Sequence, residues 1–363
     1  MSTPFQTLCL SLLVAASLGI ACDSSDAGAQ GAVTLPTGAE IMRDTVETTI
    51  VPDLRAFDTA AQEMRTGVDA FCAAPNADGL AELQVRWRSL SETWSAVAPY
   101  NLGPLDDDVI TPKIIFIESM RQRGTDYTQT VRDGIVRGIE GNEALDLAYF
   151  DRQTFDEVGL LALEVLVFED SGEGNSTEPA DVLADFAATP RKCDALRGLT
   201  ELLASCAATV HRGWTESFAD SGEPFAETMA GPELADGTEP VAALLIVLQE
   251  HLDYIKVRKL EGILDAELSG HFYPNVLATV EAMDELLSQP SEESFGLLER
   301  MEATGNAEEV AAVRANLETA KAAATDEDRD ALTAAIGLLD GNLKREIPDA
   351  LGVELGLTFT DGD

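Results

Sequence analysis

The sequence predicts an all-α protein that contains two helical bundles. Apolar residues recur every three or four positions along most of the chain, a spacing that places them on one face of a helix. Alternation of apolar and polar residues, which is typical of strands, is almost absent. With 363 residues and 45% apolar content, the chain can bury a sizeable core, and its length indicates two domains or one internally duplicated unit.

Apolar stripes mark the expected helices in chain order, and each stripe predicts one amphipathic helix. In the first half the stripes are Ile50, Leu54, Phe57, Ala61, Met64, Val68 and Phe71; Leu83, Trp87, Leu90, Trp94 and Val97; and Leu196, Leu199, Leu203, Cys206, Val210 and Trp214. In the second half they are Leu245, Leu248, Leu252, Ile255 and Leu260; Val276, Val280, Met283 and Leu287; Val310, Val313 and Leu317; and Leu332, Ile336, Leu339 and Leu343.

Segments rich in Gly, Pro and Asp interrupt this pattern at residues 99–112 and 220–240. The second segment is long enough to join two bundles. We therefore expect a first bundle over residues 41–230 and a second over residues 231–363. Between the helices, Lys113–Ile117 (KIIFI) predicts a short strand or an irregular apolar segment.

Two helix starts are predicted in the second half of the chain. Asn306, with Glu309 three positions later, resembles a capping box. Thr325 precedes three acidic residues, which are favourable near the positive end of a helix.

The N-terminal segment is typical of a bacterial secretory signal with a lipoprotein cleavage site. The first 21 residues contain no Asp, Glu, Lys or Arg, and their apolar core is too short for a spanning helix. Residues 18–22 read LGIAC, although the segment lacks the usual basic start and Leu18 lies one position further from Cys22 than is usual. We expect a signal peptide over residues 1–21, lipidation of Cys22, and a flexible tether over residues 22–40. The protein would then be exported and anchored to a membrane in the periplasm or cell envelope.

Three further cysteines, Cys72, Cys193 and Cys206, belong to the expected bundles. Cys193 and Cys206 would lie about 20 Å apart on one predicted helix, too far for a disulfide unless that helix breaks. Cys72 could pair with either of them, or all three could be buried free thiols. Their spacing does not fit a zinc site.

The chain is strongly acidic, with 24 basic and 65 acidic residues and a net charge of −41. Such a surface repels nucleic acid and anionic lipid headgroups, which excludes nucleic-acid binding as a function class. The acidity is explained by solubility or salt adaptation. The alternative explanation is attraction of cations such as iron or calcium.

Common catalytic motifs are missing from the sequence, which contains no Gly-rich phosphate loop, GxSxG or HExxH. No two of His211, His251 and His271 are four positions apart, so a helical metal pair is not expected. We interpret His211 as a partly buried packing residue, His251 as part of a solvated helix face, and His271 as part of a turn. Trp87 and Trp94 are interpreted as core residues.

A lone carboxylate, Glu164, interrupts the apolar run VGLLALEVLVF at residues 158–168. Burying an unpaired carboxylate is unfavourable and raises its pKa. Glu164 is therefore either held by a partner or positioned for function.

Four segments in order, residues 46–72, 94–114, 190–214 and 351–363, give the chain a resemblance to the imelysin family of iron-regulated bacterial envelope proteins. They correspond to the family's opening helix, its Trp to Gly-Pro and Ile-rich region, its long helix ending in Trp, and its closing Asp-Gly-Asp segment. The resemblance implies two up-down helical bundles, related as an internal duplication, with a cleft between them.

The resemblance also implies a Gly-x-His-x-x-Glu motif near that cleft. Here Gly159 and Glu164 match the motif, and Leu161 stands in place of its His. A His and a Glu three positions apart share a helix face and could hold one metal ion, so this chain keeps half of that pair. Gly159 and Glu164 are the candidate ligand-binding residues. Glu164 could instead be a structural acid, hydrogen-bonded or paired with Arg or Lys.

The C-terminal Asp361-Gly362-Asp363 could dock into the core, or it could contribute oxygen ligands to a hard cation such as calcium. Glu164, Asp361 and Asp363 are therefore the weak candidates for a metal site, and the cofactor could be iron or another divalent cation. No catalytic residue is assigned.

The favoured function is that of a non-catalytic or weakly catalytic envelope lipoprotein that binds a ligand in iron- or haem-related uptake. One expected partner is the membrane, which the lipid anchor would enter. The others are envelope proteins of iron uptake or haem redox chemistry. The family's peptidase label implies a metallopeptidase as an alternative, but metal-dependent hydrolysis needs several protein ligands, and Leu161 removes one. A structural or partner-binding envelope protein is the remaining alternative.

Overall fold

The computed structural model describes residues 35–108, 112–121, 124–172, 174–263, 265–288 and 295–355. All regular structure in these residues is helical and none is strand, which confirms the predicted all-α class. From Leu35 onward the described residues form one compact unit. None of the described helices is long and apolar enough to cross a membrane. The predicted signal peptide, Cys22, most of the tether, Asp361 and Asp363 lie outside the described residues.

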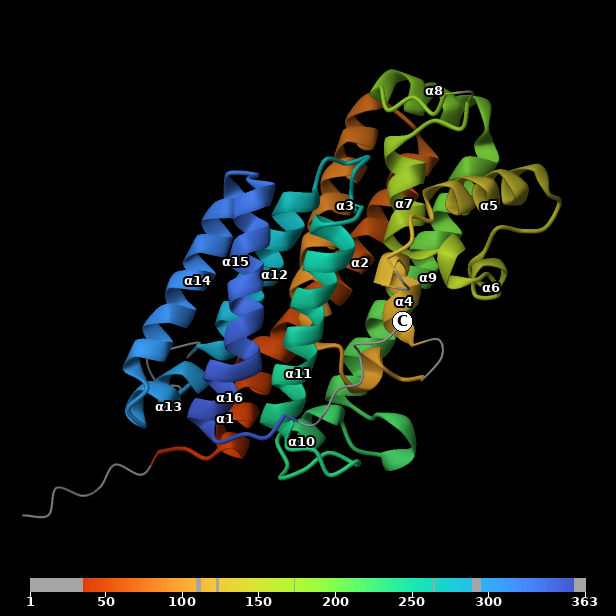
Figure 1. The fold of residues 1–363 in the computed structure, drawn as a ribbon. Coiled ribbons are helices and arrows are strands. Elements are labelled where there is room, and N and C mark those ends of the chain that lie inside the picture. The colour runs from red at the N-terminus through yellow and green to blue at the C-terminus, as the bar shows by residue number, and fades with distance from the viewer. Residues whose placement is uncertain are drawn as a thin grey trace, which may run out of the picture. The chain divides into compact units, whose positions relative to one another are not determined.

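The first helical set is built around a long helical run at the start of the described chain. Helix α1 (Gly38–Thr45) continues through a π-helical segment, η1 (Val46–Ile50), into α2 (Val51–Ala73). Helix α2 packs against α3 (Ala77–Val97) and α9 (Pro190–Thr215), and α7 (Gly159–Phe168) lies against both α3 and α9 (Figure 1). The predicted stripes of this half of the chain are buried along these helices, except for Cys206, which is half-buried.

The second set comprises α11 (Pro240–Asp253), α12 (Phe272–Leu287), α14 (Ala307–Thr325) and α15 (Arg329–Gly341). Helix α14 packs against α12 and α15, and α15 packs against α11. The π-helical segment η7 (Tyr254–Leu260) follows α11, and α13 (Leu297–Ala303) connects α12 to α14. A second π-helical segment, η8 (Asn342–Glu346), and α16 (Ile347–Leu351) follow α15.

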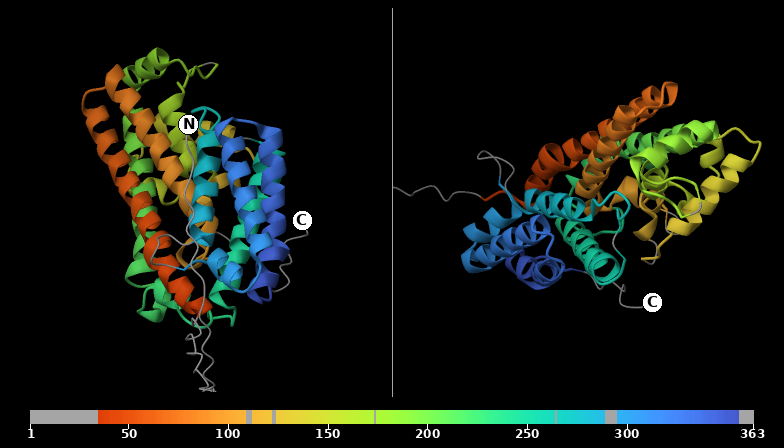
Figure 2. Two further views of the ribbon diagram at one scale, coloured as in Figure 1. Left: turned by 90° about the vertical axis from the view of Figure 1, so that its left-hand side faces the viewer. Right: turned by 90° about the horizontal axis from the view of Figure 1, so that it is seen from above.

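The two sets share a continuous interface. Helix α12 lies between α3 and α14, as Figure 2 shows from above, and α1 contacts α11. Polar contacts cross the interface, since Asn275 Nδ2 donates to Ser91 Oγ at 2.8 Å and Thr279 Oγ1 donates to the Ser95 carbonyl at 2.9 Å. Contacts of this kind join the described helices into a single unit, and the predicted boundary near residue 230 and the internal duplication stay predictions.

Short helices fill the connections between the main ones. Lys113–Ile117 forms the short helix α4, so the prediction of a strand or an irregular segment is wrong. With no neighbouring strand in the described chain, a helical turn satisfies this segment's backbone groups while Ile114, Ile115 and Ile117 are buried. Residues 220–240 also contain a helix rather than only loop. The other short helices are α5 (Thr128–Glu140), α6 (Leu147–Phe150), α8 (Pro179–Ala188) and α10 (Phe225–Met229).

Both predicted helix starts differ from the structure in their caps. Asn306 precedes α14, but its side chain makes no cap and its Nδ2 instead donates to the Met301 carbonyl. Thr325 ends α14, and α15 is capped by Asp328, whose side chain accepts from the Ala331 amide. A carboxylate in extended backbone at Asp328 serves as the cap that Thr325 was predicted to supply.

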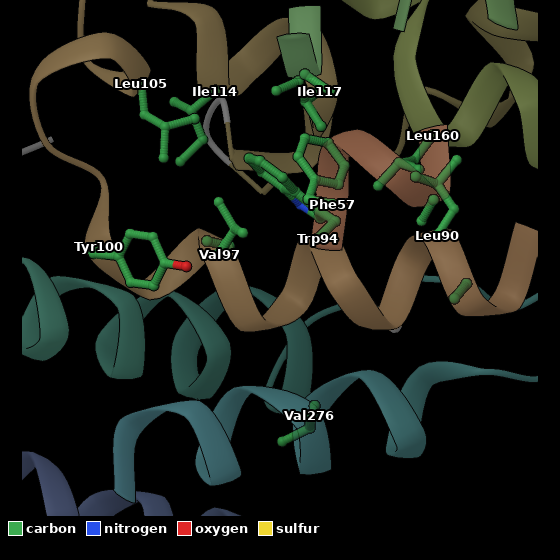
Figure 3. Packing of buried hydrophobic residues seen from close by; sticks show 14 of the residues in the cluster. Phe57, Leu90, Trp94, Val97, Tyr100, Leu105, Ile114, Ile117, Leu160 and Val276 are labelled. Carbon is green, nitrogen blue, oxygen red and sulfur yellow. The ribbon is translucent and has the colours of Figure 1, made fainter. Parts of the chain in front are cut away.

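The tryptophans lie in the core, as predicted. Trp94 is buried against Phe57, with ring centroids 5.2 Å apart, in the cluster that also contains Val97 and Ile117 (Figure 3). Trp87 is equally buried, and its Nε1 donates to the Leu160 carbonyl at 3.1 Å.

A disulfide joins Cys72 near the end of α2 to Cys193 in the first turn of α9, with Cα atoms 5.7 Å apart. Cys206 is a free thiol. Of the alternatives left open by the sequence, the structure therefore has the pairing of Cys72 with Cys193.

Candidate functional site

A cavity of about 260 Å³ opens where α3, α7 and the start of α5 meet the turn before α12. Leu161 and Glu164 both line it from α7, so the degenerate motif of the sequence faces this space. We call it the Glu164 cavity. Its apolar lining comprises Trp87, Trp94, Met120, Leu160, Leu161, Ile263, Ala266 and Leu268. Its neutral polar lining comprises Ser91, Ser95, Ser119, Thr128, Gln129 and Asn275.

Glu164 is 2% exposed, and a backbone amide of the second helical set holds its carboxylate. Its Oε1 accepts a hydrogen bond from the Ser269 amide at 2.8 Å, and it forms no ion pair with any described residue. Burial raises the pKa of Glu164 to about 7, helped by the nearby Asp265 and Glu267 and opposed by the hydrogen bonding of Ser269. Of the partners expected from the sequence, a hydrogen-bond donor is present, and an Arg or Lys is not among the described neighbours.

Leu161 lies one turn before Glu164 and is half-buried at the cavity wall. Its side chain offers no atom that can bind a metal. Among the described residues, no group of three or more His, Cys, Asp and Glu side chains is placed to hold a metal ion. The described residues therefore do not fit the transition-metal site that the family resemblance implies.

Gly159 has a backbone role at the start of α7. Its φ is +81°, and a β-carbon there would lie 2.5 Å from the Phe116 carbonyl oxygen and 2.6 Å from that of Ile117. Glycine is needed at this position because a side chain would both strain the backbone and displace the end of α4. Gly159 thus sets the direction of α7, which carries Leu161 and Glu164 to the cavity.

A second carboxylate at the cavity, Glu118, belongs to a buried ion network. Glu118 Oε1 lies 2.6 Å from Lys259 Nζ and accepts from the Tyr254 hydroxyl at 2.7 Å, while Oε2 accepts from Trp94 Nε1 at 2.9 Å. Lys259 Nζ also lies 2.5 Å from Asp265 Oδ2. The Lys259 ammonium group therefore forms ion pairs with two carboxylates, both of which line the cavity.

In this network the pKa values of Glu118 and Asp265 are shifted in opposite directions. Burial raises the pKa of Glu118, but the positive charges of Lys259 and Arg121 outweigh burial and hold it well below its usual range. Burial raises the pKa of Asp265 despite the contact with Lys259. Glu118, Lys259 and Asp265 were not predicted from the sequence, because no local pattern marks residues that meet only after folding.

The only basic side chain in the described lining is that of Arg132, and its charge is already paired. Arg132 Nε and Nη2 donate to the two carboxylate oxygens of Glu169 at 2.7 Å each. The acidic lining comprises Glu118, Asp126, Glu164, Asp265 and Glu267. The cavity is consequently rich in acceptors and negative charge, and it is suited to a ligand that brings donors.

The histidines lie outside this cavity lining. His251 is 2% exposed, so its predicted place on a solvated helix face is wrong. Its Nδ1 lies 2.6 Å from Arg121 Nη1, and burial and that guanidinium hold the pKa of His251 well below its usual range. His211 is partly buried, as predicted, with Nδ1 3.2 Å from Asp58 Oδ2. His271 lies in the predicted turn at the start of α12.

Comparisons with known proteins agree on one family. The family model for imelysin (peptidase M75) matches residues 50–350. An imelysin-like protein from Psychrobacter arcticum 273-4 has a crystal structure that covers 90% of this chain and 100% of its own, with 16% identity and a TM-score of 0.64. A protein from Parabacteroides distasonis ATCC 8503, assigned as an iron-regulated protein A precursor, covers 88% of this chain and 97% of its own, with 12% identity and a TM-score of 0.64. A comparison with curated proteins finds no match.

Proposed function

This chain belongs to the imelysin family, and from that premise we propose that it is a non-catalytic ligand-binding protein of the bacterial envelope in iron- or haem-related uptake. The observation that carries the proposal is the Glu164 cavity. It is formed around the family's motif positions, yet Leu161 replaces the side chain that would bind a metal. A retained cavity with a lost metal ligand favours binding over hydrolysis.

Hydrolysis by a metal would need several protein ligands and an open position for water. Leu161 cannot supply one, and Glu164 accepts from the Ser269 amide inside a desolvated site. The alternative of an imelysin-type metallopeptidase therefore lacks its ligand set among the described residues.

The iron- or haem-related role is supported by one relative with a shared fold, which is assigned as an iron-regulated protein precursor. Export is supported by the Cys72–Cys193 disulfide, because disulfides persist mainly in oxidising compartments. Anchoring through Cys22 rests on the N-terminal sequence pattern. Replacing Cys22→Ser should release the protein from membranes, and unchanged membrane fractionation would contradict lipidation at this residue.

A complementation experiment tests the proposed role together with the cavity. Bacteria that lack this protein should grow more slowly under iron limitation, and the wild-type chain should restore growth. Leu161→Trp fills the cavity from a half-buried position and should fail to restore it. Val85→Trp, at a position that is 59% exposed on α3 and outside the cavity, is the matched control and should restore growth.

Two results would overturn the proposal. If growth under iron limitation does not depend on the protein, the proposed uptake role is wrong. If Leu161→Trp restores growth fully, the cavity is not needed for that role. Casein incubated with the purified protein should stay intact. Cleavage that is blocked by a chelator and lost in Glu164→Gln would instead establish the metallopeptidase.

A further inference from the structure

The charge around the Glu164 cavity is not balanced within the described residues. Its five acidic lining residues face one paired guanidinium, Arg132, and the single ammonium of Lys259 serves both Glu118 and Asp265. Glu164, which lines the cavity, has no cationic partner among the described residues. A ligand that enters here meets an excess of negative charge at short range.

Buried acceptors in the same cavity lack donors. Asn275 is 4% exposed, and its Oδ1 has no hydrogen-bond partner in the described chain while its Nδ2 donates to Ser91. Asp265 Oδ1 is also buried without a partner there. Buried acceptors are nearly always satisfied in native proteins, so these two indicate a donor that comes from outside the chain. An ammonium group carries three donors and no acceptor.

Part of the cavity wall is apolar. Trp87, Trp94, Met120, Leu160 and Leu268 line it beside Leu161. A dry cavity of about 150 Å³ is enough to hold benzene, and this one measures about 260 Å³. The space therefore accommodates a short hydrocarbon body in addition to a polar group.

A bare metal ion matches this lining less well. Calcium requires six to eight oxygen ligands at about 2.3–2.6 Å, and transition metals prefer imidazole or thiolate groups. The described residues contain no group of three or more acidic, His or Cys side chains arranged in that way. An ion would also leave the apolar walls without a matching surface.

We propose that the Glu164 cavity binds an organic cation, in which one or more ammonium groups are carried on a short hydrocarbon body. The proposal rests on the ligand-binding role above and adds the chemical class of the ligand. The ammonium group pairs with Glu164 in a cavity that also offers the unfilled acceptors of Asn275 and Asp265, and the hydrocarbon body lies against the tryptophan and leucine side chains of the lining.

Calorimetry on the purified protein at pH 8 tests the proposal with probes of matched length. The cation is 1,5-diaminopentane, its neutral counterpart is 1,5-pentanediol, and its anionic counterpart is glutarate, with calcium and zinc chlorides as metal probes. We expect the diamine to bind at least tenfold more tightly than the diol and glutarate to show no binding.

Variants locate the binding site. Glu164→Gln keeps the shape of the side chain and an acceptor for Ser269 but removes the charge, and it should weaken diamine binding at least tenfold. Glu143→Gln makes the same chemical change at a side chain that is 71% exposed and outside the cavity, and it should leave binding unchanged. Circular dichroism confirms that each variant is folded. If Glu164→Gln does not fold, the cavity-filling Leu161→Trp should abolish diamine binding.

Binding of the diol as tight as that of the diamine, or equal diamine binding by Glu164→Gln and wild type, would overturn the organic-cation assignment. Glutarate, the diol or a metal could instead bind to wild type and fail to bind to Leu161→Trp. That result would refute the ligand class while preserving the proposed ligand-binding function. Absence of binding by every probe would overturn the organic-cation assignment, and the growth experiment with Leu161→Trp then decides the proposed function separately.

Discussion

The backbone amide of Ser269 donates a hydrogen bond of 2.8 Å to Glu164 Oε1, and this bond joins α7 of the first helical set to the turn before α12 of the second. The donor is neutral, so the bond orients the carboxylate without balancing its charge. Glu164 is therefore held in a fixed position while it remains sensitive to protonation. Its place in the cavity depends on both helical sets.

The pKa of Glu164 predicts a specific dependence of stability on pH. Burial raises this pKa from 4.5 to about 7 in the folded protein, while the unfolded chain keeps the ordinary value. Between these values the folded state retains a proton that the unfolded state has lost, so the contribution of Glu164 to the free energy of unfolding falls as pH rises. The expected loss is about 3 kcal/mol by pH 8.

Urea unfolding at pH 4.5 and pH 8 measures this contribution as a difference between wild type and Glu164→Gln. Since Gln does not titrate, the variant should gain up to about 3 kcal/mol relative to wild type over this range. Glu143→Gln, at an exposed site, should show no such change. A constant difference between wild type and Glu164→Gln would contradict the raised pKa.

Leu161→His should create a metal-binding pair. The new imidazole would lie one turn from Glu164 on the same side of α7, where both positions line the cavity. We expect zinc affinity to rise at least tenfold over wild type in a calorimetric titration, and the double variant Leu161→His/Glu164→Gln should lose this gain. Unchanged zinc affinity in Leu161→His would mean that the two side chains do not converge.

Gly159→Ala should destabilise the protein through both strain and a clash. The positive φ at this position costs a non-glycine residue about 1–2 kcal/mol, and the close carbonyl oxygens of Phe116 and Ile117 add to that cost. The total loss in the free energy of unfolding should exceed about 2 kcal/mol. Gly222→Ala is a matched control, because its φ is +75° but no atom lies within 4 Å of the added carbon. Equal losses in urea unfolding would show that the close approach at Gly159 does not matter.

The Cys72–Cys193 disulfide should stabilise the fold by about 2–5 kcal/mol, because it closes a loop with a sequence separation of 121 residues. Urea unfolding with and without a reducing agent measures this contribution in wild type. The double variant Cys72→Ser/Cys193→Ser should match the reduced wild type and be insensitive to the reducing agent. Cys206→Ser should still respond to it, since Cys206 is a free thiol. Equal stability of reduced and oxidised wild type would contradict this role.

Sequence patterns predicted the main helices because amphipathic periodicity is a local property that each segment carries by itself. The pattern was wrong at Lys113–Ile117, where β-branched isoleucines favour a strand but the segment is buried between helices, has no strand beside it in the described part of the chain, and forms α4. It was also wrong for His251, whose polar and acidic neighbours in sequence indicated solvent while its own side chain faces Arg121 in the interior.

By itself, the sequence determined the helical class, the family resemblance that the match over residues 50–350 later confirmed, and the anomaly of Glu164 and Leu161 in one apolar segment. The tertiary structure alone decided that Glu164 meets the Ser269 amide, that Lys259 serves both Glu118 and Asp265, and that an acceptor-rich cavity lies among them. The physical reason is the distance along the chain over which each property is determined. Helical periodicity and side-chain chemistry are written within a few consecutive residues, whereas the partners of a buried charge come from distant segments and are set only when the helices pack.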